Sequence, residues 1–478
     1  MQLLVDIPLS KKIGTLAGPV IVAMLFQTVI NQLDTAMVGR LPGATGIDGQ
    51  AGIGLSLPLF WAMGGFLSAI GIGTQAIAAR RTGENRPRLA GIALSNSLTI
   101  AVISSAAVSV LGYYLSPAFF RMMSPNPNVV HLGSSYCAIR MIGVFTMVTT
   151  MSYKSFFDGI GKTHVHMVAS ILMNLLNAGL NLLLIFGLWG FPRLEVDGAA
   201  IASVISTYVG LAVMIIWSLL PSYLKKYRYY KLKNLDKHVS WEIIRLSVPS
   251  GMATVFVMSG FLFFLWVIAN LPKGPQWLDA LSFLPLAGPL VSGIDAARPD
   301  LATSASWSMI SFLMLVFITS MAFGTATATL VSQSLGAKKP DLAERYGWES
   351  AKIGILVMGL VGLAMIIHPS MFMRIFTPKQ EVIDVALPAM RLVGSVTALM
   401  SAGMILVQAL FGAGNTRFVM IAEMLMHSLC LIPLSYVLGM VLGLGLLGCW
   451  MAAAAYAVAL SSIMAWKFYQ GKWKQIKI

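Results

Sequence analysis

Charged residues are scarce in this chain. Of its 478 residues only 11% are Asp, Glu, Lys or Arg, whereas 57% are hydrophobic, and the mean hydropathy is +0.79. Soluble domains carry about 25% charged residues. The low charge therefore excludes an ordinary soluble domain and indicates a protein embedded in a membrane.

Cysteine is scarce as well, with three residues in the whole chain. Cys137, Cys430 and Cys449 lie in or beside apolar stretches, and their spacing matches no metal-binding pattern. An odd count without regular spacing argues against a disulfide scaffold. We interpret the three cysteines as packing residues of the apolar stretches.

The sequence also lacks the short motifs of common enzymes, such as Gly-x-Ser-x-Gly and His-Glu-x-x-His. Gly161-Lys162-Thr163 resembles the end of a nucleotide-binding loop, but that loop needs a glycine where Phe156 stands. We find no convincing set of catalytic groups deep in an apolar stretch. We therefore predict that the protein is not an enzyme and that it has no cofactor. If it transports a solute, the energy must come from an ion gradient.

The sequence instead contains long apolar runs. The run from Ile13 to Leu33 holds 21 residues without a charge. Backbone amides within a bilayer must bond inside their own segment, so such runs are expected to be helices. The stretch before this run lacks the features of a cleaved signal peptide, so we expect the first helix to stay in the mature protein. The pattern predicts an all-α polytopic membrane protein with 12 transmembrane helices, at 13–38, 51–78, 90–117, 132–158, 165–190, 196–220, 243–271, 302–333, 349–374, 385–413, 418–443 and 445–468.

The chain is an internal repeat. The glycine pattern of 71–83 returns at 324–336, and Gly-x-Gly-x-Thr at 159–163 returns at 412–416, both shifted by 253 positions. An even number of helices in each copy makes the halves parallel, so we expect two pseudo-symmetric six-helix lobes around an axis along the membrane normal. A duplicated membrane chain of this size is typical of secondary transporters.

The repeat also divides the chain. We predict an amino-terminal lobe at 1–235 and a carboxy-terminal lobe at 242–478, joined by a basic linker at 221–241. Pro19 matches Pro249 with a shift of only 230, so 253 − 230 = 23 extra residues lie after the seventh helix, at about 271–300. This insertion is expected on the outer face, as a lid or as a neutral loop.

The basic residues predict an orientation. With the amino terminus inside, 23 of the 33 Lys and Arg residues fall on the inner side, so both termini are expected to be cytoplasmic. Topology then accounts for the net charge of +15 without nucleic acid as a partner. The linker is expected to lie along the anionic inner leaflet, either as a plain connector or as a phosphoinositide or regulatory site.

Polar side chains share helix faces in three of the spans. In the first span these are Gln27, Asn31 and Asp34, in the fifth Asn174, Asn177 and Asn181, and in the eleventh Glu423 and His427. Such a face cannot lie against lipid cheaply, so each of these groups is expected to face a cavity or another helix.

Each group also has a simpler interpretation. Asp34 could end the first helix near the outer surface, and the asparagines could only bond neighbouring helices. Glu423 could snorkel to the inner surface or pair with Arg417. Lys154 and Asp158, four residues apart, are read as a local ion pair.

Four short motifs, in this order and within two copies, resemble those of the multidrug and toxic compound extrusion (MATE) family. They are Asp34-Thr35-Ala36-Met37-Val38-Gly39, Gly198-Ala199-Ala200-Ile201-Ala202-Ser203, Ser332-Gln333-Ser334-Leu335-Gly336-Ala337 and Phe411-Gly412-Ala413-Gly414-Asn415-Thr416. The resemblance covers nearly the whole chain. It implies a secondary antiporter that exports amphipathic, often cationic organic compounds in exchange for protons or sodium ions. We separately expect the protein to act as a monomer in the bilayer.

The resemblance also assigns residues. It implies that Asp34 is the coupling carboxylate and that Asn177, Asn181 and Ser203 are its neighbours, with a sodium ion at Asp34 as one option for the ion. Some branches have an aspartate in place of Asn181, so a tight sodium site is in doubt here. The others, Gln27, Asn31, Asn174, Glu423 and His427, are candidates for the substrate cavity or a secondary site.

The carboxy-lobe ion site of several branches does not transfer. Their seventh-helix glutamate has no counterpart in the region from Pro249 to Gly260, which leaves Glu423 as the substitute. The nearest alternative function is a flippase for lipid-linked saccharides or lipids, which usually has a basic cavity. Basic residues deep in the spans are nearly absent here, which favours a cationic or neutral cargo. A passive channel is a further alternative.

Overall fold

The computed structural model describes residues 6–271 and 299–478 of the chain. Within these ranges the side chains of 29–35, 44, 57, 58, 61, 62, 299 and 300 are not described. The expected insertion at 271–300 thus lies almost wholly outside the described residues, and its role as a lid or a loop stays a prediction.

The described residues form helices joined by short turns. The amino half comprises α1 (Ile7–Val38), α2 (Ala44–Phe60), η1 (Trp61–Gly65), α3 (Phe66–Ser68), α4 (Ile70–Gly83), α5 (Pro87–Met123), α6 (Pro127–Gly159), α7 (His164–Phe186), η2 (Leu188–Gly190) and α8 (Glu195–Leu219). The linker forms α9 (Pro221–Tyr227) and η3 (Leu232–Asn234). The carboxy half comprises α10 (Lys237–Ala269), α13 (Pro299–Gly336), α14 (Pro340–Ile367), α15 (Pro369–Arg374), α16 (Gln380–Gly412), α17 (Thr416–Met426), η4 (His427–Leu431), α18 (Ile432–Tyr436), η5 (Val437–Val441), α19 (Gly445–Tyr469) and η6 (Lys472–Gln475).

The predicted fold class is confirmed as an all-α membrane protein. Within the described ranges, 11 helices are long and apolar enough to cross a membrane. The second expected span, 51–78, is broken into α2, η1, α3 and α4, with a π-helical turn at Trp61–Gly65. A glycine pair in that turn favours such a break, because glycine weakens a regular helix.

The repeat is visible in the bounds of the helices. α5 begins at Pro87 and α14 at Pro340, 253 positions later, and each proline lies in the first turn of its helix. Proline is favoured there because its missing N–H has no helical partner to lose. α6 and α16 keep the same shift at both ends, whereas α1 and α10 are related by 230. The sequence pattern thus set where the helices begin.

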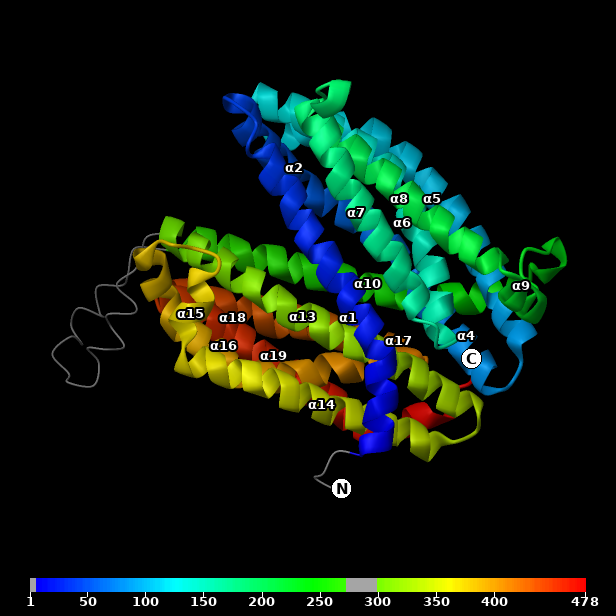
Figure 1. The fold of residues 1–478 in the computed structure, drawn as a ribbon. Coiled ribbons are helices and arrows are strands. Elements are labelled where there is room, and N and C mark those ends of the chain that lie inside the picture. Colours follow the sequence, from blue (N-terminus) through cyan, green and yellow to red (C-terminus); the bar gives the residue numbers. More distant parts are fainter. Residues whose placement is uncertain (1–5, 272–298) are drawn as a thin grey trace, which may run out of the picture.

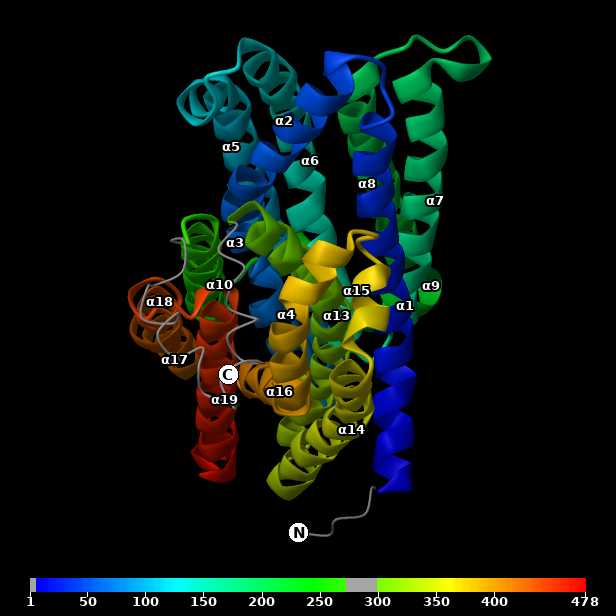
Figure 2. The same ribbon diagram turned by 90° about the vertical axis from the view of Figure 1, so that its left-hand side faces the viewer.

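Two bundles are held together at one end. Figure 1 shows them meeting near α4 and α17 and diverging toward the other end. The first helix of each half contacts both bundles: α1 packs along α7 and also on α13 and α14, and α10 packs on α17 and also on α4 and α5. Figure 2 shows the long course of α1 beside α7 and then α14.

This exchange is reciprocal at the level of single residues. Ile13 of α1 is fully buried in a cluster with Leu330 and Tyr346 of the carboxy half. Ile243 of α10, its counterpart at a shift of 230, is fully buried in a cluster with Ile70 and Ile77 of the amino half. Each half therefore contributes a helix end to the core of the other.

The halves approach each other closely between the ends of α4 and α13, a contact that we call the seam. Gly83 lies against the carbonyl of Gln333, and its counterpart Gly336 lies against the carbonyl of Arg80, so that any Cβ at either glycine would collide with the other half's backbone. Glycine is the residue that permits such backbone contact.

Hydrogen bonds across the seam end mostly on carbonyls. Gln333 Nε2 donates to the Gly159 carbonyl at 2.8 Å, and Ser332 Oγ donates to the Ala76 carbonyl at 2.7 Å. Thr329 Oγ1 donates to the Asp158 carbonyl at 3.0 Å. The Gly159 carbonyl lies at the end of α6, where no partner remains within the helix. The Ala76 carbonyl lies within α4, and the Asp158 carbonyl also accepts from the Gly161 amide, so these two accept the bonds across the seam in addition to backbone bonds.

We predict that Gly336→Ala destabilises the seam. Overpacking a close contact costs about 1–3 kcal/mol, because neither backbone can move away freely. The melting temperature of the purified protein should fall, and cysteines introduced along the seam should become more accessible to thiol reagents. Gly14→Ala is the control, because a Cβ there meets nothing within 4 Å. Equal melting temperatures for the two variants would contradict the prediction.

Candidate functional site

The polar face of α7 is buried inside the amino half. Asn174, Asn177 and Asn181 are 1%, 6% and 0% exposed. Asn177 Nδ2 donates to Ser203 Oγ of α8 at 3.3 Å, and Asn181 Nδ2 donates to Asn177 Oδ1 at 3.3 Å. The structure therefore brings together Asn177, Asn181 and Ser203, which lie on two different helices.

The remaining candidates of this half lie on α1, which packs along α7. Gln27 is half-buried. Asn31 and Asp34 belong to the α1 segment at 29–35, so their backbones are helical and their side chains lie outside the described residues. The backbone of Asp34 thus lies on a helix that contacts the one carrying the buried asparagines, and the role of its carboxylate stays a prediction.

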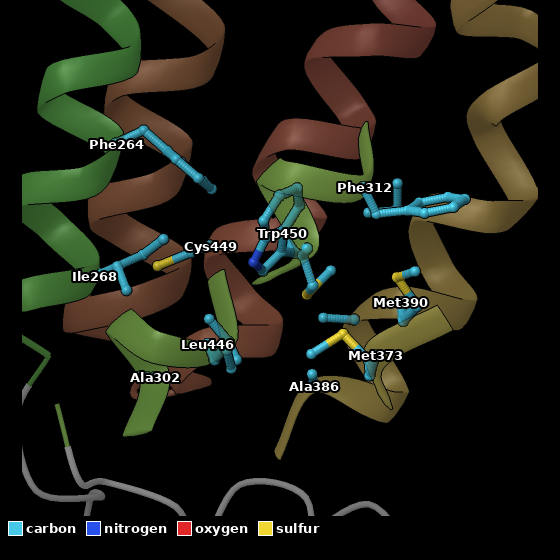
Figure 3. Packing of buried hydrophobic residues seen from close by; sticks show 14 of the residues in the cluster. Phe264, Ile268, Ala302, Phe312, Met373, Ala386, Met390, Leu446, Cys449 and Trp450 are labelled. Atoms are coloured by element: carbon cyan, nitrogen blue, oxygen red, sulfur yellow. The ribbon is translucent and has the colours of Figure 1, made fainter. Parts of the chain in front are cut away.

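The described part of the carboxy half does not repeat the Asp34 position as a polar residue. Phe264 stands where Asp34 stands in the repeat, at a shift of 230. It is 4% exposed and packs edge-on against Trp450, with ring centroids 5.4 Å apart (Figure 3). Ile268 and Cys449 belong to the same apolar cluster. The position of the Asp34 carboxylate is thus occupied in the carboxy half by an aromatic side chain within an apolar core. The two halves therefore differ chemically at this position.

A different polar cluster lies in the carboxy half. Glu423 and His427 are 8% and 3% exposed. Tyr456 Oη of α19 donates to Glu423 Oε2 at 3.1 Å, and His427 Nδ1 lies 3.4 Å from the same oxygen and 2.8 Å from the Glu423 carbonyl. Arg417, the partner considered from sequence, is exposed instead.

Sequence reasoning missed Tyr456 as a partner of Glu423. It lies 33 positions from Glu423 and on another helix, so no spacing rule connects the two residues. The ring of His427 packs against Gly260 of α10, where any Cβ would overlap it. His427 also starts the π-helical turn η4, and such turns are frequent at functional sites.

The expected ion pair of Lys154 and Asp158 is present. Lys154 Nζ lies 2.8 Å from Asp158 Oδ2, and the Asp158 side chain is fully buried. The carbonyl of Asp158 accepts the hydrogen bond from Thr329 across the seam, a link that sequence reasoning missed.

Cys137 and Cys449 are buried in apolar clusters, as expected of packing residues.

The described residues contain no group of three or more His, Cys, Asp or Glu side chains that could hold a metal ion. The oxygens available in the amino half are amide and hydroxyl oxygens. Such oxygens can bind a hard cation or accept the proton of a carboxyl group. They differ from the imidazole and thiolate ligands that transition metals prefer.

Comparison with known proteins decides the family. The MatE family model matches residues 19–183 and 295–437. The chain belongs to the MatE family. It is similar to the "Probable multidrug resistance protein NorM" of Thermotoga maritima, with 23% identity over 98% of this chain and 94% of the relative. It is also similar to the "Probable multidrug resistance protein YoeA" of Bacillus subtilis, with 22% identity over 96% and 93%.

Solved structures of MATE transporters share the fold. A multidrug resistance MATE family transporter of the MOP superfamily, in its outward-facing conformation, aligns with a TM-score of 0.83 at 19% identity, over 98% of this chain and 97% of that one. A MOP superfamily transporter from Pyrococcus furiosus aligns with a TM-score of 0.84 at 19% identity, over the same shares. At this identity the likeness is one of fold.

Membership confirms several predictions from the sequence. This MatE protein is an integral membrane transporter of the multidrug efflux type, which acts on small molecules and is not an enzyme. The fold consists of two pseudo-symmetric six-helix lobes. The family assignment does not decide whether transport is coupled to an ion or which residues would bind it.

We predict that Tyr456→Phe destabilises the carboxy-half cluster of this MatE protein. The variant removes the hydroxyl that donates to Glu423 Oε2 and leaves a buried carboxyl group short of a partner, which costs about 1–3 kcal/mol. The measurement is the melting temperature in detergent. Tyr208→Phe serves as the control, because Tyr208 on α8 is 42% exposed. A drop no larger than that of the control would show that the hydrogen bond contributes nothing.

Proposed function

We propose that this MatE protein is an antiporter that exports amphipathic organic cations in exchange for protons or sodium ions, with Asp34 as the coupling carboxylate. The observation that supports this most is the buried cluster of Asn177, Asn181 and Ser203. It lies on helices α7 and α8, and the helix that carries Asp34 packs along α7.

The cluster has a physical reason to hold an ion. Amide and hydroxyl groups inside a membrane bond with other polar groups of the bundle, and Asn177, Asn181 and Ser203 form such a set of buried oxygens and donors. A carboxylate next to them can accept hydrogen bonds from the amide nitrogens while it is charged. When it takes up a proton or a sodium ion, its charge is neutralised, and oxygens of the same cluster can bind the proton or the ion.

Exchange follows from competition for one negative charge. Loss of the charge removes a burial cost of several kcal/mol, which changes how favourably α1 packs in each arrangement of the lobes. An organic cation stabilises the charged form of Asp34, whereas the coupling ion displaces that cation. Substrate and ion then bind in turn rather than together, which is the requirement for antiport.

The orientation and the assembly are part of the proposal. We infer that the seam and the basic linker face the cytoplasm, because the loops at this end carry most of the Lys and Arg residues. The two bundles then diverge toward the outside in the arrangement of Figure 1. We also infer that one chain suffices for transport.

A lipid or lipid-linked saccharide flippase fits these observations less well. The description of the Pyrococcus furiosus structure says that a reversed polarity of its binding pocket suggests a different function, so the fold does not decide the cargo. A phosphate-bearing cargo needs available positive charge within the bundle. Lys154 lies within a membrane span, but its charge is neutralised by Asp158, whose Oδ2 lies 2.8 Å from Lys154 Nζ. We therefore favour organic cations.

We predict that Asp34→Asn abolishes uphill efflux. The variant in proteoliposomes should lose gradient-driven accumulation of an organic cation such as ethidium, because an amide cannot exchange one charge for another. Separately imposed proton and sodium gradients identify the coupling ion in the parent protein.

Asp384→Asn is the matched control, because Asp384 is an exposed carboxylate on α16. It should transport at the parental rate. If the Asp34→Asn protein is folded and still accumulates the cation at that rate, Asp34 is not the coupling residue. If the parent moves the cation only downhill, the protein is not an antiporter for it.

A further inference from the structure

The linker between the halves is a folded part of the amino half. Tyr227 and Tyr229 are 5% and 2% exposed, and their rings pack edge-on against Phe156 with centroids 5.2 and 5.8 Å away. Tyr230 Oη lies 2.7 Å from Tyr153 Oη on α6. A connector that only joins two lobes needs no such anchors.

Hydrogen bonds between the side chains of two asparagines and the backbone fix the course of the linker. Asn96 of α5 is 1% exposed; its Oδ1 accepts from the Asp236 amide at 2.9 Å, and its Nδ2 donates to the Asn234 carbonyl at 2.8 Å. Asn234 Nδ2 donates to the Arg228 carbonyl at 2.9 Å. Gly91 allows the Tyr227 carbonyl to lie directly against α5. The position of Arg228 is therefore set by the fold.

A hollow of about 300 Å³ lies between this linker and the first turns of α5. Its lining includes Tyr227 and Asn234 and three cations, Arg88 of α5 and Arg228 and Lys231 of the linker. Arg228 has a left-handed backbone with φ +51°, a conformation that costs a non-glycine residue about 1 kcal/mol or more. This conformation ends α9, where the Arg228 amide donates to the Leu224 carbonyl, so the end of the helix places Arg228 at the hollow.

The three cations of this hollow have no acidic partner in the part of the chain that the structure describes. All three side chains are exposed, and none of them forms an ion pair among the described residues. Arg88 also lies in the first turn of a helix, where the helix dipole disfavours a positive charge. Such a set of like charges is stabilised when an anion binds between them.

The repeat provides an internal comparison. The counterpart of Arg88 is Asp341 in the first turn of α14, 253 positions later. Lys474, in the segment that follows α19, lies 3.3 Å from Asp341 Oδ1 and 2.7 Å from Glu344 Oε2. At the start of α14, the charge of Lys474 is therefore neutralised by two carboxylates of the same half. At the start of α5, by contrast, three cations line an open hollow.

We propose that this hollow binds the phosphate group of an anionic molecule, either an anionic phospholipid headgroup or a soluble phosphate ester. Arginine and lysine donate charge-assisted hydrogen bonds to phosphate oxygens, and two arginines can each bind in a bidentate manner. Burial, together with the neighbouring Tyr223, raises the pKa of Tyr227 to about 12, so its hydroxyl adds no negative charge at neutral pH.

The place of the hollow suits a lipid headgroup. It lies at the start of α5, where a membrane-spanning helix emerges from the bilayer, and its lining includes Ile92. Its volume is at the lower limit of small-molecule sites and is large enough for a headgroup. The proposal does not depend on the substrate or the coupling ion of transport.

The test uses the purified full-length protein in a neutral detergent. We expect phosphatidylglycerol to be retained in native mass spectrometry and to raise the melting temperature, and phosphatidylcholine to do neither. In the triple variant Arg88→Gln, Arg228→Gln and Lys231→Gln, the affinity for phosphatidylglycerol should fall about fivefold for each charge and about a hundredfold in total.

A matched control removes the same charge from the same end of the molecule. In Lys338→Gln, Lys339→Gln and Lys472→Gln, all three side chains are exposed and lie in the carboxy half, so this variant should keep the parental affinity. If both triple variants lose affinity equally, or neither does, the proposal is wrong. Should the triple variant of the hollow misfold, Arg228→Gln alone must still show the fivefold loss.

A competition arm identifies the source of the phosphate. Glycerol 3-phosphate that displaces phosphatidylglycerol from the parent protein supports a site that also takes soluble phosphate esters. Retention of the lipid against excess glycerol 3-phosphate supports a site for the lipid headgroup with its acyl chains. Failure of the parent to bind either probe overturns the proposal.

Discussion

The structure depends on one constraint: a polar group within a bilayer must find its partner inside the protein. For the backbone this leaves helices as the means of crossing. For side chains it requires contacts between helices, and these mark the places that matter. Asn177 bonds Ser203 from α7 to α8, and Glu423 accepts from Tyr456 between α17 and α19. At these polar clusters, hydrogen bonds between helices take the place of apolar packing.

Duplication explains the architecture, and the two copies have diverged in their buried polar groups. Ile13 and Ile243 cross into opposite halves, and Gly83 and Gly336 meet opposite backbones, so the two copies still hold each other in the same way. Around this conserved frame the chemistry has changed. Asp34 corresponds to Phe264, which lies in an apolar core. A symmetric frame can thus carry different polar clusters in its two halves, and the proposed ion site belongs to the amino half alone.

Much of the fold was accessible from the sequence because the signals are local. Apolar runs predicted the helices, Pro87 and Pro340 marked two helix starts, and the spacing of the asparagines placed them on one face of α7. The residues Asn177, Asn181 and Ser203 were expected together through the family resemblance. The break in the second span and the exchange of α1 and α10 between the bundles were not expected, because both depend on packing partners.

By itself the sequence determined a duplicated, all-helical membrane protein of the MatE type, since helix formation and repeat spacing are properties of neighbouring residues. Only the tertiary structure decided which side chains meet across helices. Tyr456 reached Glu423, Gln333 reached the end of α6, and three cations gathered beside a folded linker. Such contacts depend on how each helix is rotated and placed against the next, and no spacing within one segment encodes that.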